Sequence, residues 1–271
     1  MKCPHCQAEI PETCRYCTEC GADLGIPIDT AQRRKTVKLA GGAGLALGQA
    51  ARRARLEASY DPEALIGDRA YNAIMLGVLL WGLLVNYLLC LYVGDALRAV
   101  NPLVFLLGYM ICAFVGIRIA ARSQKPLISF LGYNLVVVPF GLVISVMVEA
   151  YGGIHSSVVR DAFVYTMLIT GGMGAIVMIV PAFFEKLGGA LLGCLAGLVI
   201  CELVLLLFRV QQSVTDWVAA GLFSLYIGYD IYRSQQFAKT VDNAVDCALD
   251  IYLDVANLFI RLIEILGRKK N

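Results

Sequence analysis

The chain has 271 residues, of which 59% are apolar and only 16% are charged, and its mean hydropathy is +0.70. Soluble domains are about half apolar and about a quarter charged, so this composition excludes a disordered chain and disfavours a soluble enzyme. The formal net charge of +2 indicates no nucleic-acid-binding surface. The composition therefore predicts a protein that crosses the lipid membrane several times and carries a polar N-terminal segment.

Residues 1–24 contain cysteines at the spacing of a small zinc ribbon. Cys3 and Cys6 are separated by two residues, and so are Cys17 and Cys20. Four thiolates suit a tetrahedral, structural Zn²⁺ ion, which would stabilise a segment too short to bury a core. Two residues also separate Cys14 from Cys17, so Cys14 is an alternative ligand. Zinc ribbons of this kind begin many prokaryotic membrane proteins.

Residues 25–69 form a basic connection between the ribbon and the apolar part of the chain. Within it, residues 45–56 are predicted either to form a helix whose basic face lies on anionic lipid headgroups or to be a solvated linker. The N-terminus lacks an apolar signal segment, and basic segments favour the cytoplasmic side. We therefore expect a prokaryotic inner-membrane protein with a cytoplasmic N-terminus.

Apolar runs of membrane-spanning length follow from residue 70 to residue 266, and a basic tail, 267–271, ends the chain. A membrane-spanning helix needs about 20 predominantly apolar residues. The predicted spans are 71–94, 100–121, 126–148, 160–183, 187–208, 214–233 and 244–266. Loop charges do not decide whether the last segment crosses fully or re-enters. We favour an all-α bundle of seven helices.

Carboxylates in the last two spans are the candidate functional residues. Asp246, Asp250 and Asp254 recur every four residues on one face of the last helix, and Asp230 ends an apolar run on the preceding one. An ionised carboxylate at the bilayer centre costs at least about 2.5 kcal/mol, so such groups usually face a protein interior or a wet cavity. For Asp246 the alternative is a solvated position at the helix entrance. Glu202 is also expected to face the bundle.

The sequence around these acids resembles the signature of the Bax inhibitor-1 family. The matching segments are 223–230 (FSLYIGYD) and 248–259 (ALDIYLDVANLF), and the resemblance covers about 70–266. It implies a bundle in which six helices wrap a central last helix, and in which Asp230 and Asp254 are paired carboxylates. Two carboxylates in close contact do not both ionise at low cost, so the pair would share a proton.

The resemblance also implies a latch and an activity. In the family, a basic residue at the end of the second span bonds one of the paired aspartates in the closed state. Arg122 is our first candidate for this latch and Arg118 the second. Family members are linked to a pH-sensitive Ca²⁺ leak, so Ca²⁺ is the expected permeant ion. Asp250 departs from bacterial relatives, which carry a small neutral residue there.

Two other classes of function remain as alternatives. A membrane-embedded regulatory protein, such as a modulator of a membrane protease, would use the zinc ribbon to dock a protein partner. An enzyme is not expected, because His5 and His155 are the only histidines and Asp230 lacks the Gly-x-Gly-Asp motif of intramembrane aspartyl proteases. The oligomeric state, the direction of flow and the conducting protonation state are left open.

Overall fold

The computed structural model describes residues 2, 7, 64–93, 102–122, 125–208 and 213–268. The predicted zinc ligands and residues 25–63 of the basic connection lie outside the described residues. The side chains of residues 102–106 and 120–122 are also outside them, and this includes the guanidinium of Arg122. The zinc ribbon and the four-part division of the chain therefore stay predictions.

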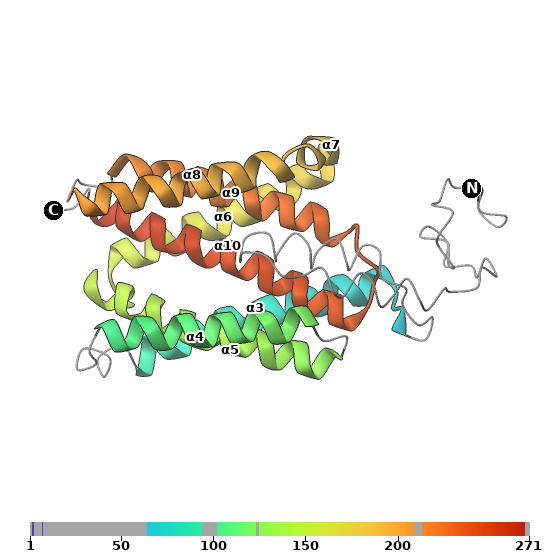
Figure 1. Cartoon of the computed structure of the whole chain (residues 1–271), viewed down its shortest axis with the longest axis horizontal. Helices are drawn as coiled ribbons and strands as arrows, with labels where there is room; N and C mark the ends of the chain where they lie inside the picture. Colours follow the sequence, from blue (N-terminus) through green and yellow to red (C-terminus); the bar gives the residue numbers. More distant parts are fainter. Residues whose placement is uncertain are drawn as a thin grey trace.

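Seven long helices and one short helix make up the described part of the chain (Figure 1). The long helices have 20 to 28 residues, and a helix of 20 residues is about 30 Å long, which matches the hydrocarbon core of a bilayer. The helices are α3 (Asp68–Tyr92), α4 (Pro102–Arg122), α5 (Pro126–Ala150), α6 (Ser157–Ile179), α7 (Pro181–Glu185), α8 (Gly188–Leu207), α9 (Ser213–Ser234) and α10 (Val241–Arg268).

Each predicted span corresponds to one long helix, and one boundary is wrong. The span predicted at 160–183 is divided, because α6 ends at Ile179 and the short helix α7 begins at Pro181. Proline lacks the backbone N–H that would continue α6, but it is favoured at the first position of a new helix. The last segment, which loop charges left undecided, is one continuous helix of 28 residues.

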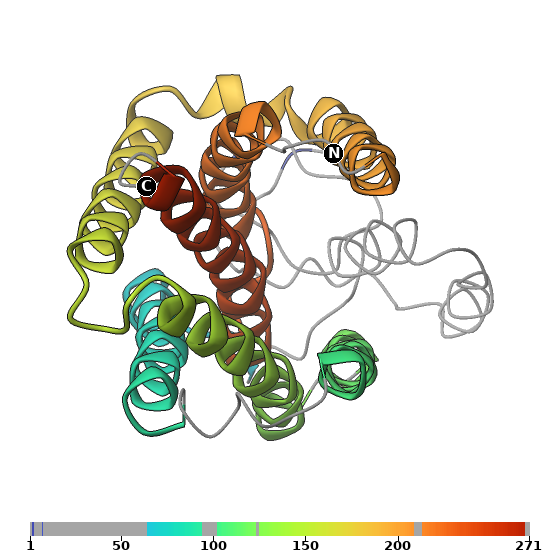
Figure 2. The same cartoon turned by 90° about the vertical axis from the view of Figure 1, so that its left-hand side faces the viewer.

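Helix α10 lies inside the bundle and is buried along most of its length. Its main neighbours are α3, α5, α6 and α9, whereas α4 packs chiefly on α5 and α8 chiefly on α9. Figure 2 shows α10 crossing the middle of this arrangement. The last helix is thus central, but four helices rather than six form its principal contacts.

The outer helices have the composition of membrane spans. By length and apolarity, α3, α5, α6 and α8 are each able to cross a membrane. Large apolar side chains are exposed on their outer faces, for example Leu80, Leu168 and Ile200, as expected for surfaces that contact lipid. Helices α9 and α10 carry more charged residues than these four. The charges of α10 are tolerated because this helix contacts mainly other helices.

Close helix contacts occur at some glycines of the bundle and not at others. A β-carbon at Gly116 in α4 would lie 2.7 Å from the carbonyl oxygen of Gly132 in α5, so the two backbones approach directly. Gly188 similarly faces the ring of Tyr229. By contrast, Gly171 and Gly172 have open space where a β-carbon would stand. Small residues therefore permit close packing at specific crossings, as in other membrane bundles.

Candidate functional site

Three of the four predicted aspartates are buried in the bundle. The exposed fraction is 5% for Asp230, 3% for Asp246 and 8% for Asp254, and Asp250 is half-buried. Asp246 thus lies inside the protein rather than at a solvated helix entrance. The carboxylates occur on α9 and α10, which pack on each other as extensively as α4 and α5 do and more than the other helix pairs of the described residues. Burial of so many acids in an apolar bundle is costly and indicates a function for them.

The register between α9 and α10 follows from contacts on either side of these acids. The hydroxyl of Tyr71 in α3 lies 3.0 Å from the carbonyl oxygen of Ser234 and 3.3 Å from Sγ of Cys247. Ser234 and Cys247 therefore lie at the same level of the helix pair. Further along, Arg261 bonds Asp216, so the two helices run antiparallel.

This register determines where the aspartates stand along the pair. With a rise of about 1.5 Å per residue, Asp230 is about 6 Å from the level of Ser234. On α10, Asp250 and Asp254 are about 4.5 Å and about 10.5 Å beyond Cys247 in the same direction. Asp230 thus lies at a level between those of Asp250 and Asp254, about 1.5 Å from the first and about 4.5 Å from the second along the axis. Asp230 shares a helix face with Ser234, and Asp250 and Asp254 share one with Cys247, because residues three, four or seven apart lie on the same side of a helix.

Polar contacts anchor the first turns of α10. Oγ of Ser129 in α5 donates to Oδ1 of Asp242 over 2.6 Å, and Nδ2 of Asn243 donates to the carbonyl oxygen of Ala238 over 2.9 Å. Lys239, in the connection before α10, places its ammonium 4.6 Å from the centre of the Tyr71 ring. Burial lowers the pKa of Lys239, and the nearby Asp68 carboxylate opposes that shift. These contacts hold the entrance of the helix in place.

A tyrosine joins the middle of α10 to two neighbouring helices. Tyr252 is fully buried, and its hydroxyl accepts a hydrogen bond of 2.7 Å from Nδ2 of Asn86 in α3. The same hydroxyl lies 3.4 Å from the carbonyl oxygen of Val137 in α5. The ring packs edge-on against Tyr133 and Phe140. Tyr252 therefore fixes the rotation of α10, and with it the direction of the acidic face.

A second group of charged side chains lies nearer the C-terminal end of α10. We call it the Arg261 cluster, and it comprises Glu202, Asp216, Arg261, Glu264 and Arg268. The guanidinium of Arg261 lies 2.7 Å from a carboxylate oxygen of Glu202 in α8 and 2.8 Å from one of Asp216 in α9. It also lies 3.4 Å from Glu264, one turn further along α10. Arg268 forms another ion pair with Asp216.

Sequence reasoning identified only part of this second cluster. The prediction that Glu202 faces the bundle is confirmed, since its carboxylate meets Arg261 on α10. The other four members of the cluster were missed. A signal was present, because Arg261 is the one charged residue in the largely apolar stretch 255–263, where an unpaired cation is costly. The sequence did not indicate which residues pair with Arg261, because these partners come from three different helices.

The predicted latch residues lie on α4. Arg118 is exposed, and its guanidinium stands 4.7 Å from the centre of the Phe114 ring on the same helix. The side chain of Arg122 is outside the described residues. That Arg122 or Arg118 acts as a latch to the paired aspartates thus stays a prediction. Among the described side chains, the guanidinium groups that bond a buried carboxylate are those of Arg261 and Arg268, and both bond Asp216.

The described residues contain no group of three or more His, Cys, Asp or Glu side chains placed to hold a metal ion. The cysteines of the described helices form no disulfide with one another: Cys90, Cys112, Cys194, Cys201 and Cys247. The buried aspartates thus form a column of charge along α10 rather than a compact cage.

Seven long helices, apolar outer faces and acids buried at the centre define a multi-pass helical membrane protein. The model of the family described as inhibitor of apoptosis-promoting Bax1 matches residues 65–271. The chain belongs to this family, in agreement with the resemblance noted in its last two spans. The family region covers every helix that the structure describes, including the two that carry the aspartates.

Similar proteins occur in two bacterial genera. An uncharacterized protein of Helicobacter pylori is 32% identical over 124 residues, which is 45% of this chain and 52% of the relative. An uncharacterized protein of Campylobacter jejuni is 34% identical over 130 residues, which is 46% of this chain and 53% of the relative. The chain thus spans about half the length of the curated relatives it matches.

Proposed function

We propose that this protein is a pH-sensitive Ca²⁺ leak channel in which Asp230 and Asp254 act as a titrating gate. Asp246 and Asp250 would line the same path on α10. The family membership supports this function, and the observation that carries it is the register of α9 and α10. That register brings the buried Asp230 to a level between Asp250 and the buried Asp254.

The gating mechanism follows from the energetics of neighbouring carboxylates. Two such groups in a shared, poorly hydrated site do not both ionise at low cost, so they bind a proton between them. With the proton bound, the carboxyl groups attract each other and α9 stays against α10. Loss of the proton leaves two negative charges, which repel each other and attract a cation. The protonation state thereby couples the contact between two helices to the charge along the path.

The proposal is tested by Ca²⁺ flux into liposomes that contain the purified protein and a Ca²⁺-sensitive dye. We expect the wild-type flux to rise by about tenfold or more between about pH 5 and pH 8, because the pair loses its proton as the pH rises and a single titrating step alters an equilibrium by up to tenfold per pH unit. The variant Asp230→Asn should lose most of this change. Its matched control is Asp161→Asn, which neutralises an exposed aspartate in the first turns of α6.

Two results would contradict the channel proposal. One is a wild-type flux no larger than that of protein-free liposomes at every pH. The other is a flux with the same pH profile in wild type and Asp230→Asn, because the titrating group would then lie elsewhere.

We further propose that residues 1–24 bind one structural Zn²⁺ through Cys3, Cys6, Cys17 and Cys20 and dock a protein partner on the cytoplasmic side of a prokaryotic inner membrane. The spacing of the cysteines supports this assignment. Deletion of residues 1–28 should remove the bound zinc, as measured by elemental analysis. The Ca²⁺ flux should stay within about twofold of wild type, because structural zinc sites have no open position for chemistry. Retained zinc, or loss of flux in a folded variant, would count against a separate docking module.

A further inference from the structure

The Arg261 cluster joins a peripheral helix to the central one. Helix α8 packs chiefly on α9, and few of its side chains are buried, among them Leu191 and Leu198. Glu202 nevertheless reaches α10, where its carboxylate contacts the guanidinium of Arg261 at 2.7 Å. The side chains of Glu202 and Arg261 are only 20% and 19% exposed. A short ionic contact therefore crosses from the outer layer of the bundle to its core.

The buried carboxylate in the cluster is Asp216. Its side chain is 1% exposed, and it bonds both Arg261 and Arg268. The two arginines and the three acids of the cluster give a formal charge of −1, so removal of Arg261 would leave three carboxylates facing a single guanidinium. A charge left without its partner in such surroundings is strongly destabilising. The ion pairs that reach α10 from α8 and from α9 thus share one guanidinium.

Arg261 also lies in line with the acids of the proposed path. It follows Asp254 by seven residues, which is two helix turns on the same face and about 10.5 Å along the axis. A cation that moves along Asp246, Asp250 and Asp254 would next meet this tethered positive charge. The guanidinium holds the carboxylates of Glu202 and Asp216, which would otherwise continue the acidic column.

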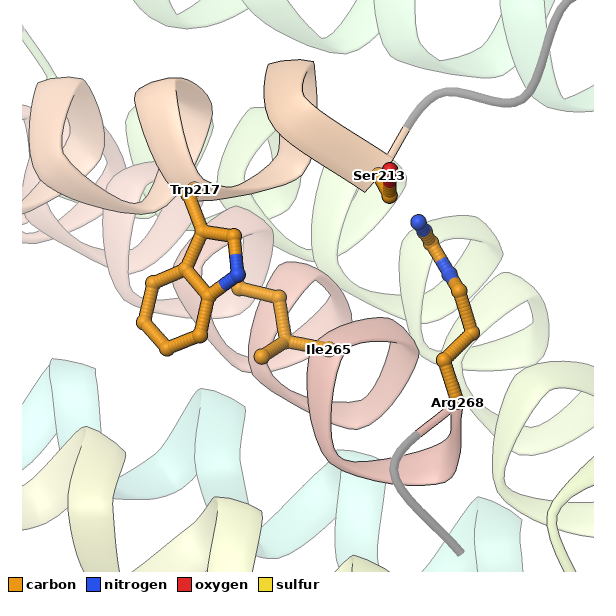
Figure 3. A pocket seen from close by; sticks show the side chains of 4 residues that line it. All are labelled: Ser213, Trp217, Ile265 and Arg268. Atoms are coloured by element: carbon orange, nitrogen blue, oxygen red, sulfur yellow. The ribbon is translucent and has the colours of Figure 1, made fainter. Parts of the chain in front are cut away.

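We infer that Arg261 is an ionic clamp and a built-in counter-cation that closes this end of the path, so that the protein has a closure separate from the Asp230–Asp254 pair. The clamp ties α8 to α10 through Glu202 and ties α9 to α10 through Asp216. A hollow lined by Ser213, Trp217, Ile265 and Arg268 lies beside it, and Figure 3 shows Arg268 reaching toward Ser213 at the start of α9. The clamp concerns helix contacts alone, whereas the closing role rests on the proposed channel function.

The test uses the full chain with Arg261→Gln, which removes the charge, and Glu202→Gln, a milder change that removes only the contact to α8. Spin labels on Cys201 of α8 and on a cysteine replacing the exposed Val146 of α5 report the distance between α8 and the core. The labelled chain has its four other helix cysteines substituted, keeps its N-terminal cysteines in the zinc-bound form during labelling, and has a flux equal to wild type. Arg160→Gln is the matched control, because this arginine is exposed and, in the part of the chain that the structure describes, forms its ion pair with its neighbour Asp161.

We expect both neutral variants to lengthen or broaden the α8–α5 distance and Arg261→Gln to raise the Ca²⁺ flux about tenfold or more, while the control changes neither. Unchanged distances in Arg261→Gln and Glu202→Gln would overturn the clamp, whatever the flux. A lengthened distance with flux equal to or below wild type would overturn the closing role. If Arg261→Gln does not fold, Glu202→Gln decides both points by the same criteria. Failure of the channel proposal is seen separately, as wild-type flux that is absent or indifferent to Asp230→Asn.

Discussion

Replacement of Asp254 by asparagine is expected to abolish most of the pH dependence of Ca²⁺ flux and to lower the flux at the more conductive pH by about tenfold or more. Asparagine has nearly the shape of aspartate but neither titrates nor carries charge. Loss of about 1.4 kcal/mol of attraction for the cation already corresponds to a factor of ten. Asp254 is 8% exposed on the central helix, so little solvent is present to compensate for the lost charge. The measurement is dye-reported flux into liposomes over a pH series.

The neighbouring acid on α10 provides the comparison for this experiment. Asp250 lies one turn away and is only half-buried. Its replacement by asparagine should reduce the flux less, by about threefold, while a pH-dependent step persists, since partly solvated charges interact more weakly. If Asp250→Asn abolished the pH response of the flux and Asp254→Asn did not, the gate would be a different pair of carboxylates.

Truncation of Tyr252 to alanine should destabilise the bundle by about 3–5 kcal/mol, the range seen when a large aromatic side chain is removed from a core. Tyr252 is fully buried and packs edge-on against Tyr133 and Phe140. Its loss would also leave the buried amide of Asn86 without the hydroxyl that it bonds at 2.7 Å. The free energy of unfolding in mixed detergent micelles measures this effect.

Two further tyrosine variants separate packing from hydrogen bonding. Tyr252→Phe keeps the ring and should cost about 1–3 kcal/mol, the penalty for a buried polar group that loses its partner. Tyr87→Ala is the matched control, because Tyr87 follows Asn86 on α3 but is 54% exposed. Equal destabilisation by Tyr87→Ala and Tyr252→Ala would show that α10 is not held by this central contact.

The number of long helices and their approximate positions were predictable from the chain alone. Membrane spans depend on local composition, because about 20 apolar residues suffice to satisfy a bilayer whatever their neighbours. The same reasoning identified Asp230 and Asp254 as costly residues that require a protein interior. The end of α6 was misplaced because apolarity continues through Pro181, whereas the backbone hydrogen-bond ladder does not.

The partners of the charged residues were less accessible to such reasoning. Arg261 bonds acids 45 and 59 residues away in sequence, on α9 and α8. Similarly, the close approach of α4 to α5 occurs at Gly116, whereas the conspicuous run at Gly171 and Gly172 meets nothing. Each of these contacts depends on how helices rotate and cross, and periodicity within one helix contains no such information.

The sequence by itself determined that this protein is a helical membrane bundle with acids on its last two spans, since hydropathy and the cost of a charge in lipid are local properties. Its resemblance to a family already implied a central last helix. Only the tertiary structure decided that four helices form the main contacts of α10, that Asp230 stands between the levels of Asp250 and Asp254, and that Arg261 joins three helices. The physical reason is that carboxylates and guanidinium groups acquire their energies from neighbours, and those neighbours are chosen by the packing of whole helices.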